Sequence, residues 1–114
     1  MANNLGDPEL ITALFDLKGQ LPDSVKLMRE YGIKKAKASS EYRAAKAVRI
    51  RELKAQGLPA TLILDLAKGD CADKQYERDM TEVIYETQKE YINSLKTEIR
   101  VLEGQIDREW GAVK

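Results

Sequence analysis

Residues 85–106, YETQKEYINSLKTEIRVLEGQI, decide the fold of this chain. Large apolar side chains recur every seven residues, at Tyr85, Ile92, Ile99 and Ile106. Leu95 and Leu102 lie three residues after Ile92 and Ile99. This heptad spacing places the apolar row on one side of a helix and is typical of coiled coils. No glycine or proline occurs from Cys71 to Glu103. The sequence therefore predicts one long helix over residues 70–110, with Asp70 as its N-cap.

A second long helix is predicted over residues 22–57, and Gly57 followed by Pro59 marks its end. The apolar face of this helix is expected to comprise Met28, Tyr31, Ala38, Tyr42, Ala45, Val48 and Leu53. Gly32 and the pair Ser39–Ser40 weaken the pattern, which leaves open whether this helix is continuous.

Two shorter segments complete the predicted architecture. Residues 1–21 contain a short amphipathic helix over Pro8–Lys18, which Gly19 and Pro22 are expected to terminate. The connector, residues 58–69, is predicted to form a short helix that closes the end of a hairpin.

The predicted fold is all-α, with a single domain over residues 1–114. The two long helices are expected to form an antiparallel, coiled-coil-like hairpin, because a short connector joins them. A lone hairpin buries little surface for a chain of this size. We therefore expect the N-terminal helix to fold back on the hairpin, or a second chain to complete it by dimerisation.

The charges are balanced overall but divided between the two long helices. The 19 basic and 19 acidic residues cancel. From Asp23 to Gly57, ten Lys and Arg stand against four Asp and Glu, a net charge of +6. From Asp70 to Trp110, six stand against eleven, a net charge of −5. One helix is basic and the other acidic, which favours their alignment side by side.

Residues that enzymes and metal sites commonly require are scarce. The chain has no histidine and a single cysteine, Cys71, and it contains no phosphate-binding glycine motif. The acidic row Glu82, Glu86 and Glu90 is interpreted as a solvated stripe, because a carboxylate metal site of a helical bundle would also use histidine. We therefore expect no catalytic residue, no metal and no cofactor.

A cytoplasmic protein that does not enter a membrane is expected. No stretch approaches the roughly 20 apolar residues that span a bilayer. The first ten residues lack the basic and apolar regions of a signal peptide. A single cysteine also fits a reducing compartment.

Repeated positive charge along the second helix makes it the candidate nucleic-acid site. The candidate residues are Lys34, Lys35, Lys37, Arg43, Lys46, Arg49 and Lys54, and Arg51 lies among them. Such a run can follow a phosphate backbone, with affinity that falls as salt rises. The alternative is that these residues pair with the acidic helix and keep the bundle in solution.

A protein partner is the other expectation. The connector residues Leu62, Ile63 and Leu66 form an apolar patch that suits docking. At the end of the last helix, Trp110 and Arg108 are of the types that often anchor interfaces. The alternative for Trp110 is packing against the N-terminal helix.

Residues 41–110 resemble a group of small helical proteins encoded by phages and prophages of Gram-positive bacteria. The resemblance rests on the segments LKAQGLPATLI (53–63), KGD (68–70), ERD (77–79) and QIDREW (105–110), in that order. Genes of this group lie in the early region, near those for single-strand annealing recombinases and single-strand-binding proteins. The resemblance implies a role in phage DNA replication or recombination, and it carries over no catalytic residue.

Three functions follow as hypotheses. The first is a non-enzymatic accessory protein of phage DNA metabolism, whose basic helix binds nucleic acid or a replication protein. The second is an inhibitor of a host defence system, similar in its action to an anti-CRISPR protein, that works by protein–protein binding. The third is a purely structural homo-oligomer.

Overall fold

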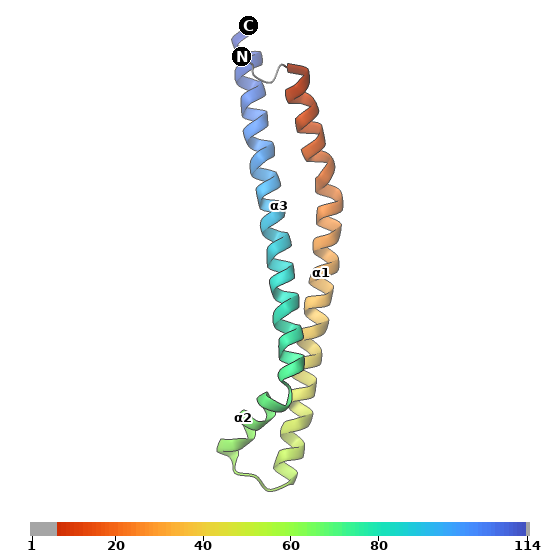
Figure 1. The fold of residues 1–114 in the computed structure, drawn as a ribbon, viewed down its shortest axis with the longest axis vertical. Coiled ribbons are helices and arrows are strands. Elements are labelled where there is room, and N and C mark those ends of the chain that lie inside the picture. The colour runs from red at the N-terminus through yellow and green to blue at the C-terminus, as the bar shows by residue number, and fades with distance from the viewer. Residues whose placement is uncertain (1–6, 114) are drawn as a thin grey trace. The chain divides into compact units, whose positions relative to one another are not determined.

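The computed structural model describes residues 7–113, and 95% of these residues are helical. The three helices are α1 (Asp7–Ala55), α2 (Ala60–Asp70) and α3 (Ala72–Val113) (Figure 1). No strand occurs among the described residues, and the all-α prediction is confirmed. Within residues 7–113, no helix has the long apolar stretch that crossing a bilayer requires.

α1 is one continuous helix of 49 residues that passes through Pro22. The prediction of a separate N-terminal helix, ending before residue 22, is therefore wrong for the described residues. Proline lacks the N–H that would bond to the carbonyl four residues earlier, and its ring disfavours a helix interior. On both sides of Pro22, however, the helix continues its inward-facing row, with Leu21 half-buried and Ser24 buried. Packing along that row outweighs the local cost of the proline.

The sequence left open whether the middle of α1 is continuous, and the structure shows that it is. Gly32, Ser39 and Ser40 all lie in regular α-helix. Ala38 and Tyr42 are buried on either side of the serine pair, so the packed face continues through it. Val48 was predicted to belong to this face, but 46% of its surface is exposed.

The end of α1 confirms the role predicted for Gly57. Gly57 has a φ of +78°, a conformation that glycine adopts at little cost. The Leu58 N–H donates to the Leu53 carbonyl at 3.4 Å, and the Gly57 N–H donates to the Lys54 carbonyl at 3.0 Å. These two bonds make a Schellman motif, in which Leu58 packs back near Leu53.

The connector contains the predicted short helix, but its end differs from the prediction. α2 continues through Gly69 to Asp70, so Asp70 is not the N-cap of the next helix. Cys71 alone separates α2 from α3 (Ala72–Val113). Its N–H donates to the Ala67 carbonyl at 3.0 Å, which extends the bonding of α2 by one residue. Cys71 has a φ of −105° and a ψ of 19°, and its side chain is buried.

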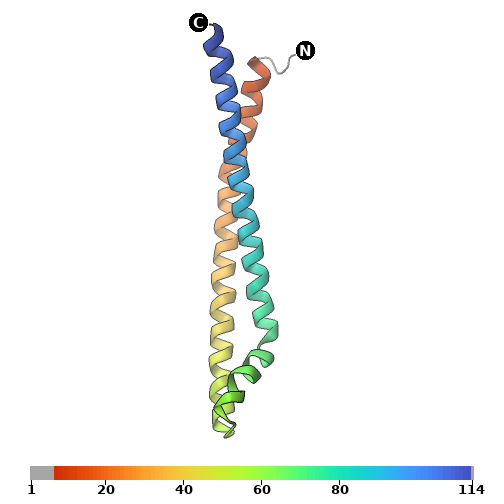
Figure 2. The same ribbon diagram turned by 90° about the vertical axis from the view of Figure 1, so that its left-hand side faces the viewer.

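The chain divides into two compact units. Unit 1 combines α1 up to Met28 with α3 from Thr87 onward, and unit 2 comprises residues 29–86. In each unit, a segment of α1 lies beside a segment of α3 that runs in the opposite direction (Figure 1, Figure 2).

Unit 1 has an aliphatic interior. Ile92, Leu95 and Ile99 of α3 are each at most 7% exposed, and the predicted heptad row thus faces inward. Leu10 of α1 is fully buried. A hydrogen bond joins α3 to α1 at Ser24, whose carbonyl accepts from Gln88 Nε2 at 3.0 Å. Other contacts between the helices are the Lys18–Glu103 ion pair at 3.1 Å and the Tyr91 hydroxyl, which donates to Gln20 at 2.8 Å.

Unit 2 has a different interior, in which tyrosine rings contact cations. The Arg78 guanidinium of α3 lies 4.6 Å from the centre of the Tyr42 ring of α1. In a second contact the helices exchange roles: Lys35 Nζ of α1 lies 4.7 Å from the centre of the Tyr85 ring of α3. Each such contact contributes about 0.5–2 kcal/mol, depending on how far it is desolvated. At the end of the unit, Ile63 and Ala67 of α2 pack on Leu53 and form its only buried apolar cluster among the described residues.

Candidate nucleic-acid interface

The seven predicted nucleic-acid-binding residues all lie on α1 within unit 2, but they do not share one environment. Three of them contact other side chains of the unit, and four are exposed. The three engaged residues are Lys35, Lys46 and Arg49. The exposed four are Lys34, Lys37, Arg43 and Lys54.

Arg49 is held in place by carboxylates. Its Nε donates to Asp70 Oδ2 at 2.6 Å, and its Nη1 lies 3.5 Å from Glu52 Oε1. The hydrogen bond that Arg49 donates to Asp70 is the main cause that raises the pKa of Arg49 above its ordinary value. A guanidinium is already protonated throughout the usual pH range, so the ion pair persists across that range. Arg49 therefore joins α1 to the end of α2 instead of facing a ligand.

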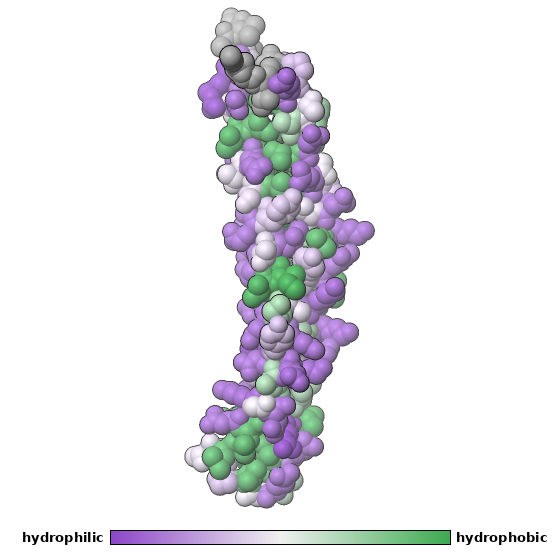
Figure 3. Space-filling model, viewed as in Figure 1, coloured by the Kyte–Doolittle hydropathy of each residue, from purple (hydrophilic) through white to green (hydrophobic). Residues whose placement is uncertain are grey.

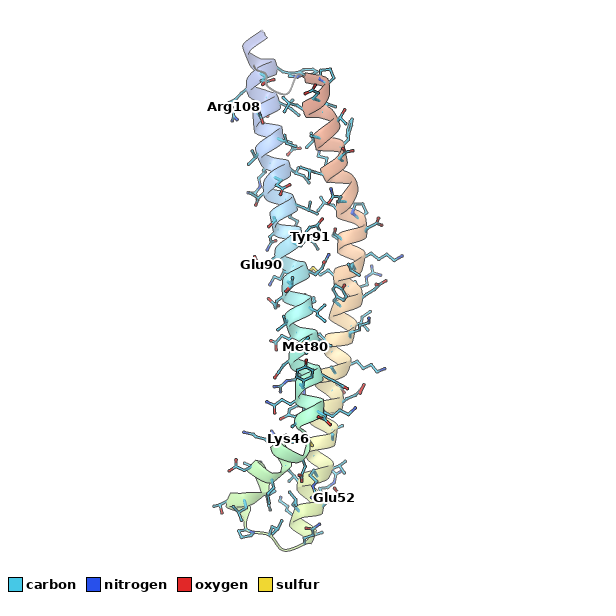
Figure 4. The ribbon with its side chains drawn as sticks, viewed as in Figure 1. Lys46, Glu52, Met80, Glu90, Tyr91 and Arg108 are labelled. Carbon is cyan, nitrogen blue, oxygen red and sulfur yellow. The ribbon has the colours of Figure 1, made fainter. Side chains whose placement is uncertain are left out.

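Lys35 and Lys46 also serve the interior of unit 2. Lys35 lies over the Tyr85 ring, as described above. Lys46 Nζ lies 5.8 Å from the centre of the Tyr42 ring, on the same helix. Figure 4 labels Lys46 and Glu52 on α1. Both lysines are half-buried residues whose Nζ atoms lie over tyrosine rings, so they are less available to a phosphate than the exposed cations.

The exposed cations form an outer α1 face, which we define by Lys34, Lys37, Arg43, Arg51 and Lys54. None of these five makes an ion pair with another residue in the part of the chain that the structure describes. Arg43 donates only to Ser39 Oγ, at 3.1 Å. Between them lie small exposed side chains, namely Ala36, Ser40, Ala44 and Ala47.

The carboxylates in this stretch of α1 are drawn away from that face. Glu41 pairs with Lys74 of α3 at 3.6 Å, and Glu52 pairs with Arg49. No other acidic residue occurs between Ile33 and Ala55. The expected neutralisation of the basic helix by the acidic one is therefore limited among the described residues of unit 2. Among the described residues of unit 2, the one ion pair between α1 and α3 is Glu41–Lys74, in which the base comes from α3.

Sequence reasoning left Arg51 out of the candidate set and included the three engaged residues. The side of α1 on which each residue lies explains why Arg49 is engaged and Arg51 is exposed. Arg49 is seven residues beyond the buried Tyr42, so it lies on the inward side of α1. Arg51 is two residues further and lies on the opposite side. Counting in steps of seven residues from Tyr42 along α1 would have distinguished the inward Arg49 from the outward Arg51.

The predicted partner-binding residues fall into two places. On α2, Leu62 and Leu66 are 49% and 42% exposed, whereas Ile63 is 5% exposed and belongs to the core. Ile63 is thus corrected from a docking residue to a packing residue. Leu64, which was not predicted, is 54% exposed. Figure 3 shows hydrophobic side chains gathered over α2.

The other two partner-binding residues lie on α3 in unit 1. Arg108 is exposed and points away from α1 (Figure 4). Trp110 is 47% exposed, so about half of its surface faces solvent. The acidic row Glu82, Glu86 and Glu90 is exposed, and no group of metal-binding side chains occurs within residues 7–113.

No family model matches this chain, and no curated protein or solved structure is found to be similar to it.

Proposed function

We propose that this chain is a non-enzymatic, nucleic-acid-binding accessory protein, which contacts the phosphate backbone with the outer α1 face. The observation that carries the proposal is the separation of charge on α1. Five cations are exposed without ion-pair partners among the described residues, while Glu41 and Glu52 are paired elsewhere. Such a face attracts phosphates, because none of its five cations is neutralised by an ion pair within the described residues.

The small side chains of the outer α1 face favour this role. Ala36, Ser40, Ala44 and Ala47 let a phosphate backbone approach the helix closely, while the longer side chains reach around it. From Lys37 to Lys54 the helix rises roughly 25 Å, at about 1.5 Å per residue. That length spans several phosphates of one strand. Contacts of lysine and arginine with phosphates carry no sequence information, so we expect binding with little sequence preference.

The setting proposed is phage DNA replication or recombination in the bacterial cytoplasm. This part rests on the resemblance of residues 41–110 to early-region phage proteins, and on a basic face that suits such a role.

The test is fluorescence anisotropy of labelled single-stranded and duplex DNA at low and physiological salt. The binding-face variant is Lys37→Gln/Arg43→Gln/Lys54→Gln. The matched control removes three exposed cations from α3 instead, Lys89→Gln/Lys96→Gln/Arg100→Gln. Both variants change the net charge equally, so only the location of the charge differs.

We expect the control to bind as the wild type does. The binding-face variant should lose most of its affinity at low salt. The slope of log affinity against log salt concentration should become shallower by about 2–3. Each lost contact with a duplex phosphate removes about 0.9 from that slope. Equal weakening of both variants would show non-specific attraction to net charge. Absence of wild-type binding at low salt would refute the proposal.

Pairing of α1 and α3 as a coiled coil is the proposed basis of the fold in unit 1. The buried and half-buried positions support it. They follow three-four spacing on α1, at Leu10, Leu14, Leu17, Leu21, Ser24 and Met28, and on α3, at Ile92, Leu95, Ile99, Leu102 and Ile106.

Inhibition of a host defence nuclease by direct binding is the second candidate function, and the exposed leucines of α2 favour it. Leu62 and Leu66 are one helical turn apart, and a soluble helix gains nothing by exposing both. A stable complex with a purified CRISPR nuclease in gel filtration, lost in the variant Leu62→Ser/Leu66→Ser, would support this function. Nuclease activity that is unchanged by an excess of the protein would contradict it.

A further inference from the structure

A row of large apolar side chains lies on the outer side of α3 in unit 2. Tyr76, Met80 and Val83 are 65%, 40% and 59% exposed. Their spacing of four and three residues places them on one face of the helix. That face is opposite to Arg78 and Tyr85, which contact α1. Figure 4 labels Met80 on this segment of α3. We call Tyr76, Met80 and Val83 the α3 row.

Carboxylates flank the α3 row. Glu77 and Asp79 pair with Lys74 and Arg78 of the same helix, at 3.9 and 3.0 Å. The exposed residues Asp73, Glu82 and Glu86 make no ion pair with any other residue between positions 7 and 113. An apolar row with unpaired carboxylates beside it is complementary to a helix that has a shallow apolar surface with cations beside it.

The outer α1 face of the same chain has these complementary properties. Its floor of small side chains is extended by Ile33 and Val48, which are 62% and 46% exposed. The cations Lys37 and Arg51 lie beside it. From Ile33 to Val48 the helix rises roughly 22 Å, which is longer than the roughly 10 Å from Tyr76 to Val83. Small residues on one helix let larger side chains of another pack closely against it.

We propose that the α3 row of one copy docks on the outer α1 face of a second copy of this chain. An α3-to-α3 contact would bring Glu82 and Glu86 near their own equivalents, which like-charge repulsion disfavours. The α1-to-α3 contact instead places these carboxylates near Lys37, Arg43 or Arg51 of the neighbour.

Two different surfaces meet in this contact, so it is heterologous. Each surface faces away from the interior of unit 2, on its own side of that unit. A docked pair therefore keeps one free α3 row and one free outer α1 face, to which further copies can add. This inference does not depend on nucleic-acid binding, although both use the outer α1 face. A nucleic acid and a second copy would compete for that face.

The test is sedimentation velocity at protein concentrations from about 10 to 300 μM and low salt. Three exposed-site variants are compared. The variant Met80→Glu/Val83→Glu blocks the α3 row, and Ala44→Glu/Ala47→Glu blocks the outer α1 face. The matched control, Leu62→Glu/Leu66→Glu, puts two glutamates on the exposed apolar side of α2. Circular dichroism establishes that each variant keeps the wild-type helix content.

We expect the wild type and the control to exceed the mass of two chains of 12.9 kDa as concentration rises. Each blocked variant alone should stay monomeric. An equimolar mixture of the two blocked variants should form a complex of two chains and no larger species, because one intact row meets one intact face.

A monomeric wild type over the whole concentration range would overturn the proposal. It would also be overturned if the mixture of blocked variants stayed monomeric, or if the control lost association as fully as they do. Should a blocked variant lose helix content, Glu82→Lys/Glu86→Lys serves in its place, since it inverts the flanking charge and leaves the apolar row intact. That variant should associate at least ten-fold more weakly, and unchanged association would overturn the proposal. The variant Met80→Glu/Val83→Glu should bind DNA as the wild type does. Failure of the self-association proposal can therefore be distinguished from failure of the proposed function.

Discussion

Pro22 lies inside α1, with helix on both sides, and its replacement tests whether the helix is continuous there. The change Pro22→Ala supplies an N–H that can donate to the Lys18 carbonyl, and it removes a ring that crowds the preceding turn. Pro22 is exposed, so little packing is lost. In an exposed helix interior, alanine is about 3 kcal/mol more favourable than proline. We therefore expect the free energy of unfolding to rise by about 2–3 kcal/mol.

The assay is urea unfolding, followed by circular dichroism at 222 nm and by the fluorescence of Trp110. With a slope of about 2 kcal/mol per M, the expected gain moves the midpoint upward by about 1–1.5 M. Gly19→Ala is the matched comparison, since Gly19 is one turn away and an added Cβ there meets no atom within 4 Å. That change should stabilise by only about 0.5–1 kcal/mol.

A midpoint that falls or stays unchanged in Pro22→Ala would refute the continuous helix at this position. If Gly19→Ala were stabilising in the same experiments, the break would lie at Pro22 itself. If neither change stabilised the protein, the stretch between Lys18 and Pro22 would be non-helical in solution, as the sequence pattern alone had predicted.

The remaining predictions concern the end of α1 and the interior of unit 1. Gly57→Ala should destabilise by about 1–2 kcal/mol, because its φ of +78° brings a Cβ close to the next carbonyl; thermal unfolding measures the loss, and an unchanged melting temperature would contradict the Schellman geometry. Ile99→Ala, at a position 7% exposed, should cost about 2–4 kcal/mol in urea unfolding. Val101→Ala, at 59% exposure, should change stability by less than about 0.5 kcal/mol, and equal losses at both positions would contradict the inward heptad row.

Much of the local structure could be predicted from the sequence, because helix termination and helix period depend only on neighbouring residues. Gly57 and Pro59 predicted the end of α1 correctly, since the left-handed conformation that ends a helix favours glycine. The three-four spacing of Ile92, Leu95 and Ile99 predicted which side of α3 is buried, since the helix period alone decides which residues share a face.

The candidate site was predicted only in outline. Charge along α1 identified the basic helix, and four of the seven selected residues are exposed. Arg49 and Arg51 are separated by two positions, yet one is bound to Asp70 and the other is free of ion pairs among the described residues. The sequence does not reveal that Asp70 ends α2 beside Arg49, because this contact joins residues that are 21 positions apart.

Sequence by itself determined that the chain is helical, where α1 ends and which helix carries the positive charge. These properties follow from backbone preference, helix period and composition, all of which act within a few residues. Tertiary structure decided the continuity of α1 through Pro22, the burial of Ile63 and the cations that remain available to a ligand. Each of these depends on which distant side chain packs alongside, and the free energy of that packing exceeds the local preference that opposes it.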